Sequence, residues 1–228
     1  MTPSEAHKLT LTVDAQHKVS ALLLAPPDAF ACCVFAHGAG ASMTHRSMEV
    51  VATELAQRGM ATLRYQFPYM ESGKKHTDPP ALCHATVRAA VGEAAHLMPG
   101  VPLIAGGRSF GGRMTSQAQA SAPLPRVQGL AFIGFPLHPA DKPSTERATH
   151  LHDVKIPMLF LQGTRDALAE LQLLRPVIEK LGQRATLELF EDADHSFHVR
   201  ARSGRTDVEV REAMLDATLA WMATVIAS

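Results

Sequence analysis

The chain has 228 residues, 46% of them hydrophobic, and its 22 basic residues balance its 22 acidic residues. A chain with no net charge lacks the basic excess of a nucleic-acid-binding protein, and no apolar run approaches the roughly 18 residues that a membrane span needs. We therefore expect one globular domain over residues 1–228, with neither a nucleic acid nor a membrane as partner.

The cysteines and the N-terminal segment indicate a reducing compartment. Cys32 and Cys33 are adjacent within an apolar run and Cys83 stands alone, so the three do not form a disulfide framework. We expect them to be buried, reduced thiols. The first residues lack the basic segment and apolar stretch of a signal peptide, and we expect a cytoplasmic protein.

The chain begins with β structure. Apolar and polar residues alternate over 9–13, a polar turn follows, and residues 19–25 form a second expected strand. The run Ala31–Ala36 is apolar throughout, which is typical of a strand buried on both faces.

From there, short apolar runs alternate with longer helical segments. The expected strands cover residues 60–65, 103–108, 127–135, 157–162 and 185–190, and the expected helices cover 46–58, 81–98, 110–121, 168–181 and 207–226. The segment 68–80 is an expected loop, and the polar segment 137–155 is expected to hold one short helix. Repeated strand–helix–strand units predict an α/β fold, with a mainly parallel sheet covered by helices on both faces.

The most informative motif joins the strand at 103–108 to the following helix. It reads Gly107-Arg108-Ser109-Phe110-Gly111, a Gly-x-Ser-x-Gly pattern between an apolar strand and a helix. In this context the serine occupies a strained strand-to-helix turn that exposes its hydroxyl, and the helix N-terminus behind it favours negative charge. Ser109 is therefore the candidate nucleophile.

A serine nucleophile needs a base and a group that orients the base. Asp166 and His195 follow Ser109 in the chain order acid then base, and each comes just after a predicted strand. The carboxyl ends of parallel strands share one sheet edge, so we expect all three residues to meet there. Asp166 also suits the N-cap of the next helix. The rival residues are Asp153, Asp192, Asp194 and His198.

An oxyanion hole needs two N–H donors beside the nucleophile. We expect the amide of Phe110, directly after the serine, and the amide of Ala39 in the glycine-rich loop after the strand Ala31–Ala36. His37 opens that loop, and we expect it to brace the loop by hydrogen bonding.

Other polar residues near predicted strand ends have less defined roles. His138 either lines the substrate pocket or lies in a surface loop. Arg108 and Arg113 flank the nucleophile, and we expect structural ion pairs for both, with Arg108 alternatively facing the cleft. The cluster His150-x-His152-Asp153 lacks a third ligand at a recognisable spacing, so we expect no metal and no cofactor.

These motifs resemble the α/β-hydrolase superfamily, in particular small bacterial members related to dienelactone hydrolases and carboxylesterases. The similarity runs from the His37 loop through the serine turn and the Gly-Thr-Arg-Asp166 segment to Asp194-His195-Ser196-Phe197. It implies an eight-stranded, mostly parallel sheet without a large cap domain, with Ser109 as nucleophile, His195 as base and Asp166 as orienting acid. Dienelactone hydrolases carry a cysteine at the position of Ser109, so dienelactone is not the expected substrate.

The expected function is that of a carboxylesterase-type serine hydrolase. It would cleave a small-molecule ester or thioester through an acyl-enzyme. The short segment 137–155 leaves little material for a lid, so we expect an open site. The alternative is a binding or scaffolding protein of the same fold with little or no turnover. The acyl group, the leaving group and the oligomeric state stay open.

Overall fold

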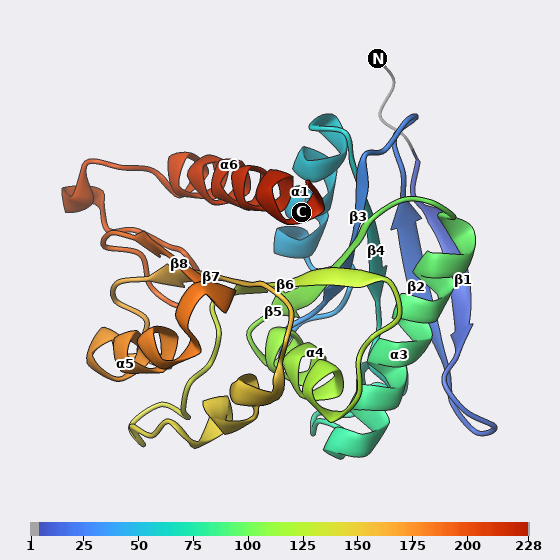
Figure 1. The fold of residues 1–228 in the computed structure, drawn as a ribbon, viewed down its shortest axis with the longest axis horizontal. Helices are drawn as coiled ribbons and strands as arrows, with labels where there is room; N and C mark the ends of the chain where they lie inside the picture. Colours follow the sequence, from blue (N-terminus) through green and yellow to red (C-terminus); the bar gives the residue numbers. More distant parts are fainter. Residues whose placement is uncertain (1–4, 228) are drawn as a thin grey trace.

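The fold is built on one eight-stranded sheet (Figure 1). A computed structural model describes residues 5–227. The strand order is β1-β2-β4-β3-β5-β6-β7-β8, and the strands are β1 (His7–Thr12), β2 (Lys18–Leu24), β3 (Ala31–Ala36), β4 (Met60–Tyr65), β5 (Leu103–Arg108), β6 (Val127–Ile133), β7 (Met158–Gly163) and β8 (Ala185–Phe190).

The sheet is mostly parallel, as the alternation of strands and helices predicts. Only the pairs β1–β2 and β2–β4 are antiparallel, while β4, β3, β5, β6, β7 and β8 run parallel. Parallel neighbours need crossover connections, and helices supply them here. The carboxyl ends of β3, β5, β6 and β7 therefore meet at one edge of the sheet.

Helices cover both faces of this sheet (Figure 1). The α-helices are α1 (Arg46–Gln57), α2 (Pro68–Glu71), α3 (Pro80–Leu97), α4 (Phe110–Ser121), α5 (Leu171–Leu181) and α6 (Asp207–Ile226), and the 3₁₀ helices are η1 (Glu146–Asp153), η2 (Gly182–Arg184) and η3 (Ala201–Ser203). Helices α1 and α6 pack on one face, and α3, α4 and α5 pack on the other.

Two hydrophobic clusters, one on each face, form the core. The cluster under α1 and α6 includes Met48, Leu55 and Met214, and the cluster under α3 and α4 includes Val87 and Met114. Because β3 contributes to both clusters, all six of its residues are buried, as its apolar run predicts. Each buried aliphatic side chain contributes about 1.5–3 kcal/mol to folding.

Three differences from the sequence prediction have an identifiable local cause. The short helix α2 lies inside the expected loop 68–80, because Pro68 supplies the φ that a first helical residue needs. Strand β6 ends at Ile133, before Gly134 turns the chain with a φ of +67°. Helix α5 begins at Leu171 and not at Leu168, whose N–H donates to the Asp166 carboxylate in the preceding turn.

The segment 137–155 forms no separate layer over the sheet edge. Its one helical element, η1, buries Ala148 and Leu151 against the core. The absence of a large cap therefore agrees with the expectation from sequence. Within residues 5–227, no helix combines the length and the apolar character that crossing a membrane requires.

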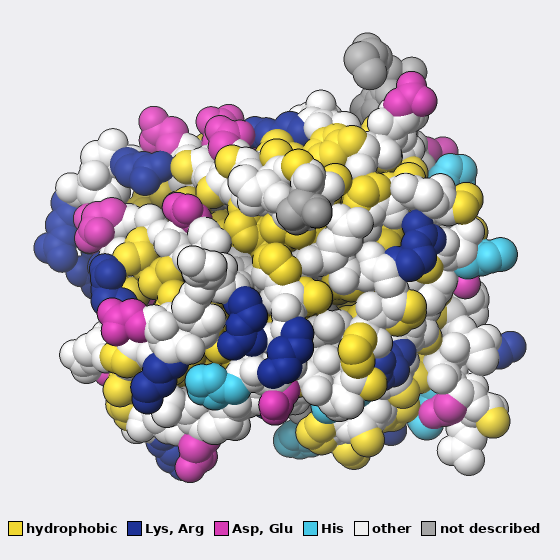
Figure 2. Space-filling model, in the orientation of Figure 1, with side chains coloured by type: hydrophobic (Ala, Val, Ile, Leu, Met, Phe, Trp, Pro, Cys, Tyr) yellow, Lys and Arg dark blue, Asp and Glu magenta, His cyan; other side chains and the backbone are white. Residues whose placement is uncertain are grey.

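The distribution of charged side chains and the state of the cysteines both match the expectations from sequence. On the face shown in Figure 2, acidic and basic side chains are interspersed. Cys32, Cys33 and Cys83 are all buried and free, as expected. Burial raises the pKa of each thiol to about 12, so these thiols stay protonated near neutral pH.

Candidate active site

Ser109 occupies a strained turn between β5 and α4. Its φ of 49° lies in the left-handed region, where a side chain is strained. Close packing holds the turn in place. A Cβ at Gly107 would lie 2.5 Å from the Ala36 carbonyl oxygen, and a Cβ at Gly111 would lie 2.5 Å from the His37 carbonyl oxygen. Both glycines of the motif are therefore required by this close approach to β3 and the loop that follows it.

A continuous hydrogen-bond chain links the three candidate catalytic residues, Ser109, His195 and Asp166. The Ser109 hydroxyl lies 2.8 Å from His195 Nε2, and His195 Nδ1 lies 2.7 Å from Asp166 Oδ2. Since the carboxylate only accepts, Nδ1 carries the proton of the neutral imidazole and Nε2 accepts from the serine. This arrangement is that of a nucleophile, a base and an orienting acid.

Asp166 is held by further contacts, one of which comes from a residue that the sequence motifs did not indicate. The carboxylate is buried, and it accepts from the Leu168 N–H at 2.8 Å and from the side-chain amide of Gln162. The amide orientation of Gln162 is defined, because its Oε1 accepts the Phe135 N–H at 3.0 Å. Gln162 thus orients the acid. The available signal was a single amide residue within the otherwise apolar strand β7.

The rival residues contribute to other contacts. His198 is exposed and pairs with Asp207 at 2.9 Å, which raises the pKa of the imidazole. Asp194 accepts the backbone N–H groups of Ser196 and His198 and so shapes the loop that carries His195. Asp166 is not the N-cap of α5, since Glu170 takes that position.

The two expected oxyanion donors have N–H groups available. Among the described residues, neither the Phe110 amide nor the Ala39 amide donates a hydrogen bond. Phe110 is the first residue of α4, where N–H groups lack partners within the helix. The loop that carries Ala39 passes close to the nucleophile, since a Cβ on Gly38 would lie 3.9 Å from the Ser109 Cβ.

His37 braces this loop, as expected. Its Nε2 accepts the Phe67 N–H at 3.1 Å, so its Nδ1 carries the proton and donates to the Gly38 carbonyl at 2.8 Å. Burial lowers the pKa of His37 to about 4. The ring is therefore neutral near pH 7 and acts as a fixed structural link.

Tyr69 supplies a second brace that the sequence did not reveal. Its hydroxyl donates to the Ala39 carbonyl at 2.8 Å, and its ring packs edge-on against those of His37 and Phe110. Burial raises the pKa of this phenol, so it stays a donor. Tyr69 belongs to α2, a short helix within the segment that the sequence predicts to be a loop. No local pattern in the sequence connects Tyr69 to Ala39.

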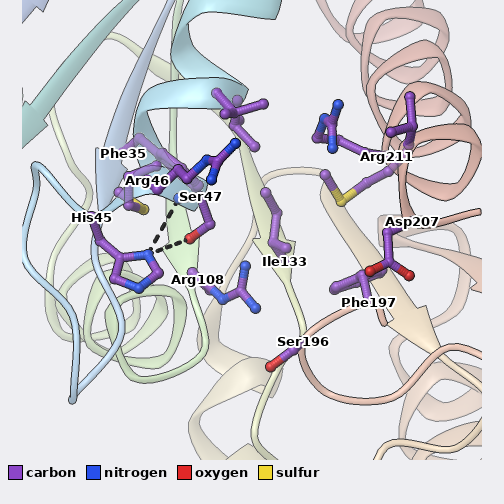
Figure 3. Close-up of a pocket in the computed structure, with 15 residues that line it drawn as sticks. Phe35, His45, Arg46, Ser47, Arg108, Ile133, Ser196, Phe197, Asp207 and Arg211 are labelled. Atoms are coloured by element: carbon purple, nitrogen blue, oxygen red, sulfur yellow. Dashed lines mark hydrogen bonds between the residues drawn. The ribbon is translucent and has the colours of Figure 1, made fainter. Parts of the chain in front are cut away.

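The flanking arginines do not form the expected structural ion pairs. Within the described residues, neither Arg108 nor Arg113 has a carboxylate within ion-pair distance. Arg113 instead lies over the Phe110 ring, 5.7 Å from its centroid. Arg108 lines a cavity of about 490 Å³ beside the nucleophile (Figure 3).

His138 lies neither in a surface loop nor on the cavity wall, so both predictions for it are wrong. The residue is fully buried, and its Nδ1 donates to the Pro139 carbonyl at 2.9 Å. His138 therefore lies in the interior and lines neither the surface nor the cavity.

The described residues hold no cluster of three or more His, Cys, Asp or Glu side chains suited to a metal ion. His150, from the sequence cluster that raised the question of zinc, contacts the Ser116 hydroxyl at 2.7 Å instead. The Ser116 hydroxyl donates to the Arg113 carbonyl, so it accepts a hydrogen bond from His150. In a nucleophile–base pair the serine would donate to the histidine, so this pair has the reverse direction.

The sequence comparison identifies a family. A family model described as an alpha/beta hydrolase domain matches residues 29–223. This match spans the loop of His37, the turn of Ser109, and both Asp166 and His195.

Solved structures with the same fold are numerous. An a/b serine hydrolase without a lid from Xanthomonas campestris is 23% identical, with a TM-score of 0.72 and coverage of 97% of each chain. A dienelactone hydrolase from Anabaena variabilis is 22% identical, with a TM-score of 0.76 over 94% of this chain and 96% of that one. Est1E from Butyrivibrio proteoclasticus, with ferulic acid bound, is 16% identical, with a TM-score of 0.75 over 96% and 100%.

Proposed function

The chain belongs to the alpha/beta hydrolase family, and on that premise we propose that it is a serine hydrolase of the carboxylesterase type. Its substrate is a small-molecule carboxylic ester or thioester, cleaved through an acyl-enzyme on Ser109. The observation that carries the proposal is the hydrogen-bond chain from Asp166 through His195 to Ser109, with distances of 2.7 and 2.8 Å.

In the first step, the Ser109 oxygen attacks the carbonyl carbon while its proton passes to His195 Nε2. The carbonyl π bond breaks and its electron pair moves to the oxygen, which becomes an oxyanion. The N–H groups of Phe110 and Ala39 receive this oxyanion. A single donor of this kind contributes about 3–4 kcal/mol to transition-state stabilisation.

In the second step, the oxyanion re-forms the carbonyl and the bond to the leaving group breaks. His195 Nε2 gives its proton to the departing oxygen or sulfur. Water then repeats the sequence on the acyl-enzyme, with His195 taking a proton from the water and returning one to Ser109. Asp166 stabilises the imidazolium in both halves and maintains the tautomer that leaves Nε2 free to accept.

The supporting contacts fit such a reaction. Asp166 is buried with three hydrogen-bond donors around it, so its position is fixed before the substrate arrives. The loop of Ala39 is braced from below by His37 and Tyr69. Preorganised groups of this kind require no reorganisation at the moment of reaction. The buried, free thiols support a reducing compartment, and we propose that the protein acts in the cytoplasm.

Labelling with a fluorophosphonate probe tests the proposal directly. We expect wild-type protein to be modified and Ser109→Ala to remain unmodified. A folded wild-type protein that does not react would refute the proposed function and favour a binding or scaffolding role. A phosphonylated residue other than Ser109 would refute the assignment of the nucleophile.

A matched pair of histidine variants tests the base. His195→Ala should remove most ester turnover, with losses of up to about a million-fold. His198→Ala changes the same loop but removes an exposed ring that pairs with Asp207. The kcat of this variant should stay within about threefold of wild type. The reverse pattern would contradict the assignment of the base.

A further inference from the structure

A cavity of about 490 Å³ lies beside the nucleophile, on the face of the sheet that α1 and α6 cover. Neither Ser109 nor His195 lines it, but their chain neighbours Arg108 and Ser196 do. The cavity therefore adjoins the reacting atoms. Its apolar wall includes Phe35, Met48, Val51, Ile133, Phe197 and Met214.

Arg108 brings a positive charge into this apolar space. As the last residue of β5, it points to the same face as Ile104, which is buried under α1 and α6. Figure 3 shows its side chain extending between His45 on one side and Ile133 and Ser196 on the other. Within residues 5–227, its guanidinium forms no hydrogen bond and no ion pair.

The nearby carboxylates are engaged elsewhere. Asp166 and Asp194 act on Arg108 only through space, and their effect opposes the burial that lowers its pKa. Asp166 accepts from His195, and Asp194 accepts the backbone N–H groups of its own loop. Burying part of a guanidinium without an anion in contact with it costs desolvation free energy. An anion that enters the cavity would therefore form charge-assisted hydrogen bonds with Arg108.

The other charges of the cavity reinforce this preference. Arg46, exposed at the start of α1, is a second cation without an ion pair among the described residues. Arg211 is paired with Glu54 at 2.9 Å, and Asp207, the one acidic residue among the described residues that line the cavity, is paired with His198. As far as the structure describes its lining, the cavity thus holds two cations without an ion pair, Arg108 and Arg46, and no unpaired carboxylate.

We propose that this cavity selects ester or thioester substrates that carry a carboxylate, with Arg108 as the residue that binds it. This inference rests on the proposed function. A guanidinium presents its N–H groups in a planar fork that matches the two oxygens of a carboxylate. Because Arg108 and Ser109 have Cα atoms only about 3.8 Å apart, a short aliphatic chain joins the carboxylate to the reacting carbonyl. The apolar wall receives that chain.

The test compares substrates that differ only in this charge. The mono-4-nitrophenyl ester of adipic acid and 4-nitrophenyl hexanoate share a six-carbon acyl chain, and only the first ends in a carboxylate. A second pair, 4-carboxyphenyl hexanoate and phenyl hexanoate, places the carboxylate on the leaving group. The readout is the ratio of kcat/KM for the charged and neutral member of each pair, after subtraction of spontaneous hydrolysis.

The variants isolate the contribution of Arg108. Arg108→Met keeps an unbranched chain and removes the charge, and we expect it to lower the ratio in the adipate pair by about tenfold to a hundredfold, with a smaller change in the leaving-group pair. Arg46→Met changes an exposed residue with little risk to folding, and it should lower the same ratio by about threefold. Arg175→Met removes an exposed charge from α5 outside the cavity and should leave the ratio at its wild-type value.

The possible failures are distinct. If wild-type protein hydrolyses the neutral esters and Arg108→Met leaves the ratio of the adipate pair unchanged, Arg108 does not bind a carboxylate on the acyl chain, and the proposed function stands. An equal change in the ratio for Arg175→Met would likewise refute the proposed selection of a carboxylate, since the change would then reflect only the net charge of the protein. If wild-type protein hydrolyses no ester and does not react with the fluorophosphonate, the proposed function itself is wrong.

Discussion

Replacing Gln162 tests whether the geometry of Asp166 depends on a residue outside the Ser-His-Asp chain. Gln162→Leu keeps the approximate volume and removes both side-chain hydrogen bonds, one to the Asp166 carboxylate and one from the Phe135 N–H. A hydrogen bond to a charged group contributes about 1.5–3 kcal/mol, and an unpaired buried N–H costs about 1–3 kcal/mol. We expect the free energy of unfolding to fall by about 4 kcal/mol.

The effect on catalysis is smaller than that of losing the acid itself. In Gln162→Leu, Asp166 keeps the Leu168 N–H and His195 as partners, so the carboxylate shifts but is not released. A displacement of about 1 Å in a catalytic group costs up to a hundredfold in rate. We therefore expect kcat for 4-nitrophenyl hexanoate to fall about tenfold to a hundredfold, with little change in KM.

Gln162→Glu separates positioning from simple loss of packing. Its introduced carboxyl group faces the Asp166 carboxylate, and two like charges repel each other in a buried site. A proton shared between the two groups preserves the hydrogen bond at low pH. Because loss of that proton leaves both groups charged, the free energy of unfolding and kcat should both fall relative to wild type as pH rises.

A buried amide elsewhere in the fold provides the control. Gln119 also accepts a backbone N–H, that of Leu124 at 2.7 Å, but it lies on α4 away from Asp166. Gln119→Leu should lower the free energy of unfolding and leave kcat within about twofold. Urea unfolding and steady-state kinetics measure both quantities. Parallel pH profiles for wild type and Gln162→Glu, or an unchanged kcat in Gln162→Leu, would refute the reasoning.

Three further predictions concern the loop and turn around the nucleophile. Tyr69→Phe removes the hydrogen bond to the oxyanion loop and should lower kcat by about threefold to tenfold with KM unchanged; an unchanged kcat would contradict the brace. The pKa of His37 is lowered from 6.5 to about 4, so stability is lost as pH falls below 6.5, by about 2 kcal/mol at pH 5; urea unfolding of His37→Gln should lack this loss, and an equal loss would disprove it. Gly111→Ala should cost about 1–3 kcal/mol in urea unfolding and reduce fluorophosphonate labelling, because its Cβ would meet the neighbouring backbone. Gly92→Ala, in open space on α3, should instead be neutral or slightly stabilising, and similar effects of the two changes would rule out the steric account.

Much of the fold was predictable because the signals are local. The apolar run Ala31–Ala36 predicts a strand buried on both faces, and β3 is that strand. The Gly-x-Ser-x-Gly pattern predicts a tight turn because the steric demands act within five residues and their immediate neighbours. The eight-stranded sheet agrees with the implied family fold. The start of α5 was not predictable, since the Asp166 turn decides it, whereas Pro68 marks the start of α2 locally.

The choice between candidate histidines illustrates where local patterns end. His195 and His198 lie in one loop, three residues apart, and either could follow a strand end. The structure turns the chain at Phe197, whose φ is 62°, so that His195 faces Ser109 while His198 faces Asp207. Asp194 stabilises that turn through two backbone N–H groups. No periodicity in the sequence encodes this direction.

Sterics and hydrophobic periodicity act over a few residues, so the amino-acid sequence predicts which segments form strands and helices, the strained turn at Ser109 and the kinds of group available for chemistry. Which atoms meet depends on the packing of segments that are far apart in the chain. Gln162 orients Asp166 and Tyr69 braces the loop of Ala39 through contacts that depend on how distant segments pack. The cavity around Arg108 forms because α1 and α6, far apart in the chain, cover the same face of the sheet beside Ser109.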